Sequence, residues 1–223
     1  MGCQRYRDWY MTDDLGPTST TLTTVDGFSL EAQLAMPDVP RAGVVICHPH
    51  PQHGGNMHSL VVSTLFTHLK DAGCAALRFN FRGVGRSEGE HDFGEGEQLD
   101  VRAAVEVMAA AGDIHCPIVL AGWSFGADLA LTCNAPELAG WFLVAPPLRV
   151  LEASRFKAAP DSRPKWLAVP ERDQFNPPDQ ARAAIADWAN AEIHPVGGAD
   201  HFLVGRTDKL NGLIEEFLAS LAA

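Results

Sequence analysis

Short apolar runs rich in β-branched residues alternate along this chain with longer segments of helical periodicity. The run Gly43–Cys47 is continuously apolar, which predicts a strand buried on both faces. Similar runs predict further strands over residues 74–81, 117–121, 140–145, 164–169 and 192–196. Apolar spacings of three and four residues predict helices over 58–72, 97–111, 125–134, 178–190 and 205–221. This order predicts an α/β fold with a mostly parallel central sheet and helices on both faces.

The N-terminal part departs from this alternation. Residues 19–25 and 28–36 are both β-rich, and Asp26-Gly27 between them is a strong hairpin signal, so we expect an antiparallel edge to the sheet. The 223 residues suffice for one domain with a substantial core and are few for two. We therefore expect a single domain over 18–223, preceded by a flexible N-terminal extension over 1–17.

The net charge and the cysteine content indicate which binding partners and which cellular compartment to expect. The formal net charge of −11 disfavours binding to nucleic acid or to an anionic membrane surface. The apolar runs are too short to span a bilayer, and the first fourteen residues contain no apolar signal-peptide core. Five cysteines, four of them in or beside apolar segments, are typical of reduced thiols. We expect a cytoplasmic protein that needs no cofactor and no metal, and whose oligomeric state the sequence leaves open.

The most informative segment is a glycine–serine turn between a predicted strand and a predicted helix. Residues 118–131 have the sequence IVLAGWSFGADLAL, which contains a G-x-S-x-G pattern centred on Ser124. A serine hydroxyl is a weak nucleophile unless a sharp turn exposes it to a base, and flanking glycines permit that turn. The turn also places the Phe125 N–H where it can stabilise an oxyanion. The simpler alternative is a tight turn whose serine caps the helix, but the strand-before, helix-after context favours catalysis.

This segment resembles the nucleophile elbow of the α/β-hydrolase superfamily, and the resemblance extends over nearly all of residues 20–221. More closely, the chain resembles small capless bacterial serine hydrolases of the dienelactone-hydrolase type, which have an H-P-H-P loop after the third strand. That loop is here His48-Pro49-His50-Pro51. The resemblance implies that it supplies a second oxyanion donor, and because proline has no N–H the local donor is the backbone of His50.

Two further segments carry the resemblance. Residues 82–87 match the R-G-x-G-x-S loop of the superfamily, and we interpret them as a structural loop near the edge of the site. The order Ser…Asp…His is the one expected for this fold. His201 follows the last strand in a Gly-Gly loop and is the expected general base. Asp173 is the expected acid, with Glu171 as the alternative, because the glycine usual before this aspartate is missing here.

A zinc site and a cysteine nucleophile are the two alternatives to a catalytic serine. Four histidines lie within eleven residues, at positions 48, 50, 53 and 58, and neutral imidazole is a common zinc ligand. No cysteine or carboxylate in that stretch stands at a familiar zinc spacing, however, which disfavours a metal site. Cys47 and Cys116 are poor candidates for a nucleophile, because burial in or beside a strand raises a thiol pKa.

The predicted function is that of a serine hydrolase similar to carboxylesterases. Only residues 146–165 separate two main strands where larger relatives insert a lid, so we expect an open site and a small ester, thioester or lactone as substrate. Trp123, Phe175 and Phe202 could form the pocket wall, although each could equally belong to the core. Acyltransferases and peptidases use the same triad, and a non-catalytic binding module of the same fold is the alternative from a different class.

Overall fold

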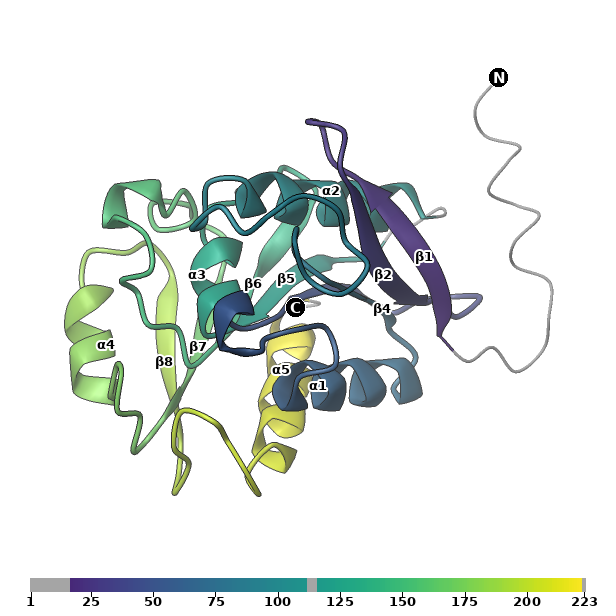
Figure 1. Cartoon of the computed structure of the whole chain (residues 1–223). Helices are drawn as coiled ribbons and strands as arrows, with labels where there is room; N and C mark the ends of the chain where they lie inside the picture. The colour runs from purple at the N-terminus through teal and green to yellow at the C-terminus, as the bar shows by residue number, and fades with distance from the viewer. Residues whose placement is uncertain (1–16, 112–115, 222–223) are drawn as a thin grey trace.

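A single eight-stranded sheet organises the molecule (Figure 1). The computed structural model describes residues 17–111 and 116–221. The sheet order is β1-β2-β4-β3-β5-β6-β7-β8. β1 (Thr18–Thr23) pairs antiparallel with β2 (Ser29–Ala35), and β2 pairs antiparallel with β4. All other pairings are parallel, and they join β3 (Gly43–Cys47), β4 (Ala75–Phe79), β5 (Ile118–Trp123), β6 (Leu138–Val144), β7 (Lys165–Pro170) and β8 (Ala191–Val196).

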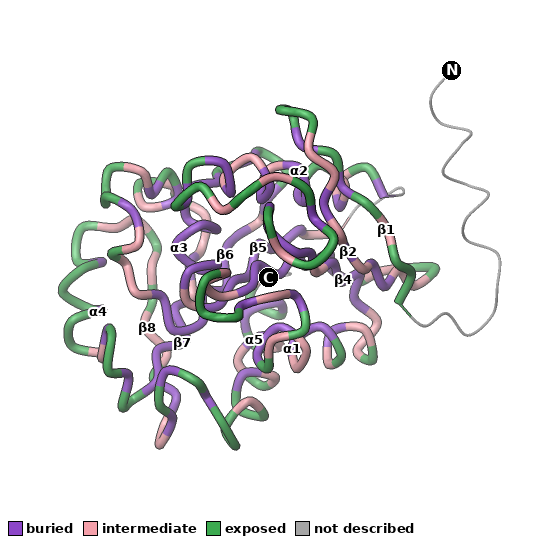
Figure 2. The backbone as a smooth tube through the Cα atoms, viewed as in Figure 1, coloured by how far each residue is buried: buried purple, intermediate pink, exposed green. Residues whose placement is uncertain are grey.

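Helices cover both faces of this sheet. On one face lie α1 (Leu60–Asp71) and α5 (Asp208–Ser220), whose buried side chains share a core cluster with Val44 and Ile46 of β3. On the other lie α2 (Glu97–Ala110), α3 (Phe125–Ala130) and α4 (Pro178–Ala184), packed with Val45 and Cys47. Alternate residues of a strand point to opposite faces, so the four side chains after Gly43 in β3 contribute in turn to the two cores. Figure 2 shows the central strands buried between these layers.

The predicted α/β class, the mostly parallel sheet and the antiparallel N-terminal edge are confirmed. Two helices end four or more residues before the predicted position. The helix expected over 125–134 ends at Ala130, because the Thr132 N–H and hydroxyl both donate to the Leu129 carbonyl in a tighter turn. The helix expected over 178–190 ends at Ala184, and the Ala189 N–H donates to Ala159 instead of continuing the helical ladder.

No lid covers the carboxyl edge of the sheet between β6 and β7. Residues 145–164 are all described, and their only helical element is the three-residue 3-10 helix Ala153–Arg155. The expected N-terminal extension falls almost wholly on residues 1–16, outside the described part of the chain, and so stays a prediction. Among the described residues, no helix has the length and apolarity that crossing a membrane requires.

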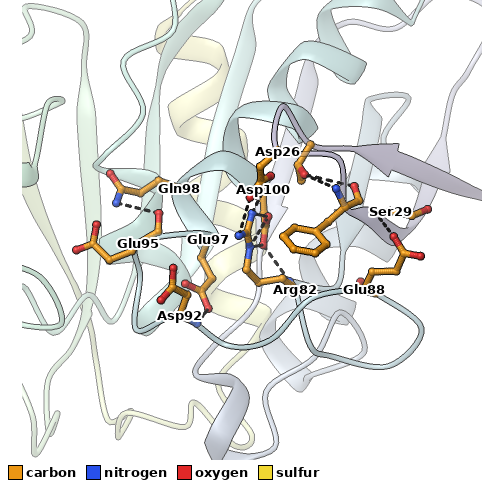
Figure 3. A network of polar contacts seen from close by, with 12 residues as sticks. Asp26, Ser29, Arg82, Glu88, Asp92, Glu95, Glu97, Gln98 and Asp100 are labelled. Atoms are coloured by element: carbon orange, nitrogen blue, oxygen red, sulfur yellow. Dashed lines mark hydrogen bonds and ion pairs between the residues drawn. The ribbon is translucent and has the colours of Figure 1, made fainter.

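A buried ion-pair network anchors the loop after β4 (Figure 3). The Arg82 guanidinium donates to Asp100 of α2 at 2.7 Å and to Asp26 of the N-terminal hairpin at 3.0 Å. Asp100 is fully buried, which raises the pKa of its carboxyl against the opposing hydrogen bonds from Arg82. Burial also disfavours the charge of Arg82, but the two carboxylates outweigh it and raise the pKa of the guanidinium. The network therefore ties the 82–87 loop to a helix and to the edge hairpin.

Two arginines of this loop provide a matched test. Arg82→Met should lower the free energy of unfolding by about 3–5 kcal/mol, because it leaves the Asp100 carboxylate buried without its partner. Arg86→Met should cost at most about 1 kcal/mol, because the Arg86 side chain is 78% exposed where it pairs with Glu31. Urea unfolding followed by tryptophan fluorescence measures both. Equal losses for the two variants would contradict the assigned role of the buried network.

Candidate active site

Ser124 stands at a sharp turn between the end of β5 and the start of α3. Its backbone has φ 54° and ψ −120°, a left-handed conformation that is strained for a residue with a side chain. The Ser124 N–H donates to the Val144 carbonyl of β6 at 2.9 Å, and the Ser124 carbonyl accepts from the Ala127 N–H at 2.9 Å. The serine hydroxyl makes no capping bond to α3. Helix capping therefore does not explain this serine.

The hydroxyl instead meets a histidine and, through it, an aspartate. His201 Nε2 lies 2.9 Å from Ser124 Oγ, and His201 Nδ1 lies 2.8 Å from Asp173 Oδ2. His201 and Asp173 are 5% and 4% exposed, so bulk water competes little for either contact. The second oxygen of Asp173 accepts the N–H groups of Phe175 at 2.8 Å and Asn176 at 3.1 Å. The structure thus brings together the three residues that the sequence predicted as a triad.

Neighbouring strands position the two partner loops. Asp173 follows β7 and His201 follows β8, and the carboxyl ends of parallel strands lie at one edge of the sheet. Glu171, the alternative acid, accepts the Gly198 N–H at 2.7 Å and so holds the histidine loop from outside. Asp200 accepts the Phe202 and Leu203 N–H groups at 3.1 Å. Neither carboxylate replaces Asp173 at His201.

The predicted wall residues divide into two kinds. Trp123 is 8% exposed and packs in the core cluster beneath α1 and α5, while its indole N–H donates to the His201 carbonyl at 3.2 Å. It therefore supports the histidine loop from within the core. Phe175 and Phe202 are 40% and 48% exposed, and both rings contact the ring of His201. These two remain candidates for substrate contact.

His48, which the sequence placed in the H-P-H-P loop and disfavoured as a zinc ligand, organises the loop after β3. Its Nε2 accepts the Phe81 N–H at 3.0 Å, so the proton of the neutral ring is on Nδ1, which donates to the Pro49 carbonyl at 2.6 Å. The side chain is fully buried, and burial lowers its pKa to about 4. Nothing in the local sequence signals this role, because its partner Phe81 lies in the loop after β4, about thirty residues further along the chain.

The two residues expected to stabilise an oxyanion are neighbours. Phe125 begins α3, where the first N–H groups have no partner inside the helix, and its ring centroid lies 4.9 Å from that of His50. The His50 carbonyl accepts the Gly55 N–H at 3.0 Å, and a Cβ on Gly55 would collide with the Pro49 carbonyl. This tight loop sets the backbone of His50 beside the elbow.

The competing chemistries gain no support from the geometry. Within residues 17–111 and 116–221, no group of three histidine, cysteine or acidic side chains is arranged to hold a metal ion. Burial raises the pKa of the Cys47 thiol well above its usual range and also raises that of Cys116. Cys47 is completely buried in β3, where no substrate reaches it.

Comparison with known proteins identifies the family. The family model described as serine aminopeptidase, S33, matches residues 38–192. The chain belongs to this family of the α/β-hydrolase superfamily. An uncharacterised protein of Rickettsia prowazekii is 30% identical over 199 residues, which cover 85% of this chain and 83% of that protein.

Two solved structures share both sequence and fold with this α/β hydrolase. An α/β serine hydrolase homologue from Coxiella burnetii is 31% identical with a TM-score of 0.77, over 91% of this chain and 97% of that one. A lidless α/β serine hydrolase from Xanthomonas campestris is 27% identical with a TM-score of 0.77, over 92% and 95%. The predicted superfamily and the predicted lack of a sizeable lid are confirmed.

The buried His48 makes the stability of this α/β hydrolase depend on pH. Because its pKa is about 4 in the folded chain and near 6.5 when unfolded, the unfolded chain binds the extra proton. Its contribution is complete above pH 6.5 and falls as the pH drops toward 4, by about 2 kcal/mol between pH 7.5 and pH 5. Urea unfolding at these two pH values should show that difference between the wild type and His48→Gln. Equal pH dependence of the two proteins would disprove the assignment.

Proposed function

We propose that this α/β hydrolase is a serine carboxylesterase that cleaves a small ester, thioester or lactone through an acyl-enzyme on Ser124. The observation that carries the proposal is the unbroken chain of contacts from Ser124 Oγ through His201 to Asp173, at 2.9 and 2.8 Å. A serine hydroxyl needs such a partner to act as a nucleophile. The site also lies on a sheet edge without a lid, which suits a small substrate that enters directly from solvent.

Each residue has one task in the proposed reaction. Asp173 keeps the His201 proton on Nδ1, which leaves Nε2 free to accept the proton of Ser124. Ser124 Oγ attacks the acyl carbon, and the N–H groups of Phe125 and His50 stabilise the charge that develops on the carbonyl oxygen. His201 then donates its proton to the leaving group. Water, activated by the same histidine, releases the acyl group and regenerates Ser124.

Peptide hydrolysis is the second candidate, because the matching family model is described as serine aminopeptidase. The same three residues would act, and an amine would take the place of the alcohol as leaving group. Comparing a p-nitrophenyl ester of alanine with alanine p-nitroanilide separates the candidates, since the acyl group is common to both. Cleavage of the anilide at a rate comparable to that of the ester would replace the esterase proposal with an aminopeptidase.

A fluorophosphonate probe tests the nucleophile directly. We expect intact-protein mass spectrometry to show a single adduct on the wild type and none on Ser124→Ala, because only a serine activated by a base reacts readily with this probe. Hydrolysis of p-nitrophenyl acetate by Ser124→Ala should fall by at least about a thousandfold. A folded wild type that forms no adduct would instead favour a non-catalytic binding module.

A matched pair of variants tests which carboxylate near His201 acts as the triad acid. Asp173→Asn should lower kcat by about a hundredfold or more, because the amide no longer holds the histidine proton on Nδ1. Glu171→Gln should leave kcat within about threefold of the wild type, because Glu171 contacts the loop backbone and not the imidazole. Steady-state kinetics with p-nitrophenyl acetate measure both. A larger loss in Glu171→Gln than in Asp173→Asn would reverse the assignment.

A further inference from the structure

Two exposed phenylalanines flank the histidine of the site. Among the described residues, Phe175 and Phe202 are large apolar side chains that remain 40% and 48% exposed. The Phe175 ring centroid lies 4.5 Å from that of His201 with the planes at 68°, and the Phe202 centroid lies 5.6 Å away with the planes at 88°. Each ring therefore meets the imidazole in an edge-to-face contact and leaves much of its surface to solvent.

Hydrogen bonds hold the backbone of both phenylalanines. The Phe175 N–H donates to Asp173 Oδ1 at 2.8 Å, and the Phe202 N–H donates to Asp200 Oδ1 at 3.1 Å. The guanidinium carbon of Arg149 lies 5.7 Å from the Phe175 ring centroid, close enough for a cation–π contact. Because the loops of the acid and the base carry these rings, their apolar surface lies beside His201.

The proposed reaction determines which part of a substrate comes next to this surface. In the acylation step the Ser124 Oγ–carbon bond forms, the ester carbon–oxygen bond breaks, and the departing oxygen takes the proton that His201 received from Ser124. That oxygen must lie within hydrogen-bond reach of His201 Nε2. We therefore expect the group attached to it to lie next to the rings that contact His201.

We propose that Phe175 and Phe202 form the binding site for the leaving alcohol, and that this enzyme takes esters of aromatic alcohols. The inference rests on the proposed esterase function and adds its substrate class. An aromatic alcohol would bury its ring against two aromatic surfaces at once, each worth a few-fold to about tenfold in binding. If the two rings only shielded His201 from water, replacing them would change the rate with every ester alike.

Benzyl acetate and ethyl acetate test the proposal, because they share one acetyl-enzyme and their alcohols have similar acidity. We expect the wild type to favour benzyl acetate in kcat/KM by about tenfold or more. Phe175→Leu and Phe202→Leu should each lower that preference about two- to tenfold. Phe93→Leu is the matched control, because Phe93 is also exposed, at 71%, but its ring contacts His91 and not His201. It should keep the wild-type preference.

The remaining outcomes separate this proposal from the esterase function. Both leucine variants should slow acylation by benzyl acetate more than they slow hydrolysis of the shared acetyl-enzyme, followed by single-turnover mass spectrometry, since the alcohol has already left before that step. Equal loss on both esters, or a changed preference between ethyl acetate and ethyl hexanoate instead, would overturn the alcohol site and leave the esterase function intact. If the wild type cleaves neither acetate and forms no fluorophosphonate adduct, the esterase function itself fails.

Discussion

The backbones of β5, α3 and the loop after β3 meet at the elbow without a side chain between them. A Cβ on Gly122 would collide with the Gly126 carbonyl, and a Cβ on Gly126 would collide with the carbonyls of Cys47 and His48. This close approach compresses the turn and accompanies the left-handed backbone of Ser124, a strain of about 1–3 kcal/mol that the surrounding core supports. It also places the first turn of α3 directly against the loop that carries His50. The rest of the site depends on this contact, because it sets the nucleophile and both expected oxyanion donors relative to one another.

Buried polar groups also hold the other loops at the carboxyl edge of the sheet. Asp128, in the first turn of α3, accepts the N–H groups of Leu148, Arg149 and Val150 at 2.9–3.1 Å. Burial raises the pKa of its carboxyl to about 6 against these three hydrogen bonds, which is the balance expected of a buried acceptor with many donors. Asn176 donates to the Pro146 carbonyl at 2.9 Å and so joins the loop after β7 to the loop after β6. Because the backbone of each loop is bonded to a neighbouring element, the positions of Asp173 and His201 follow from the fold and need no lid.

Local patterns predicted the elements and the nucleophile, the resemblance to the superfamily implied the other two triad residues, and long-range contacts explain what neither could predict. The strand β3 and the elbow at Ser124 are visible in consecutive residues, because burial on both faces and the strand–turn–helix context leave a continuous signal. His201 and Asp173 follow from the resemblance, which implies an acid and a base after two of the predicted strands. The role of His48 depends on the Phe81 N–H in the loop after β4, so no spacing in its own segment could indicate it. The early end of α3 likewise depends on the hydrogen bond from Thr132 to Leu129, which helical periodicity does not predict.

The nucleophile and its partners are held by different parts of the molecule. Ser124 belongs to the rigid junction of β5 and α3, whereas His201 and Asp173 belong to loops that are joined through the pairing of β7 with β8 and through Glu171 at the Gly198 N–H. Phe175 and Phe202 lie on those same loops, and it is their backbone N–H groups, not their rings, that bond to Asp173 and Asp200. A different side chain at either position therefore preserves the hydrogen bonds that hold the acid and the base. In this architecture the side chains that we propose meet the leaving group can change while the backbone contacts of the acid and base loops are kept.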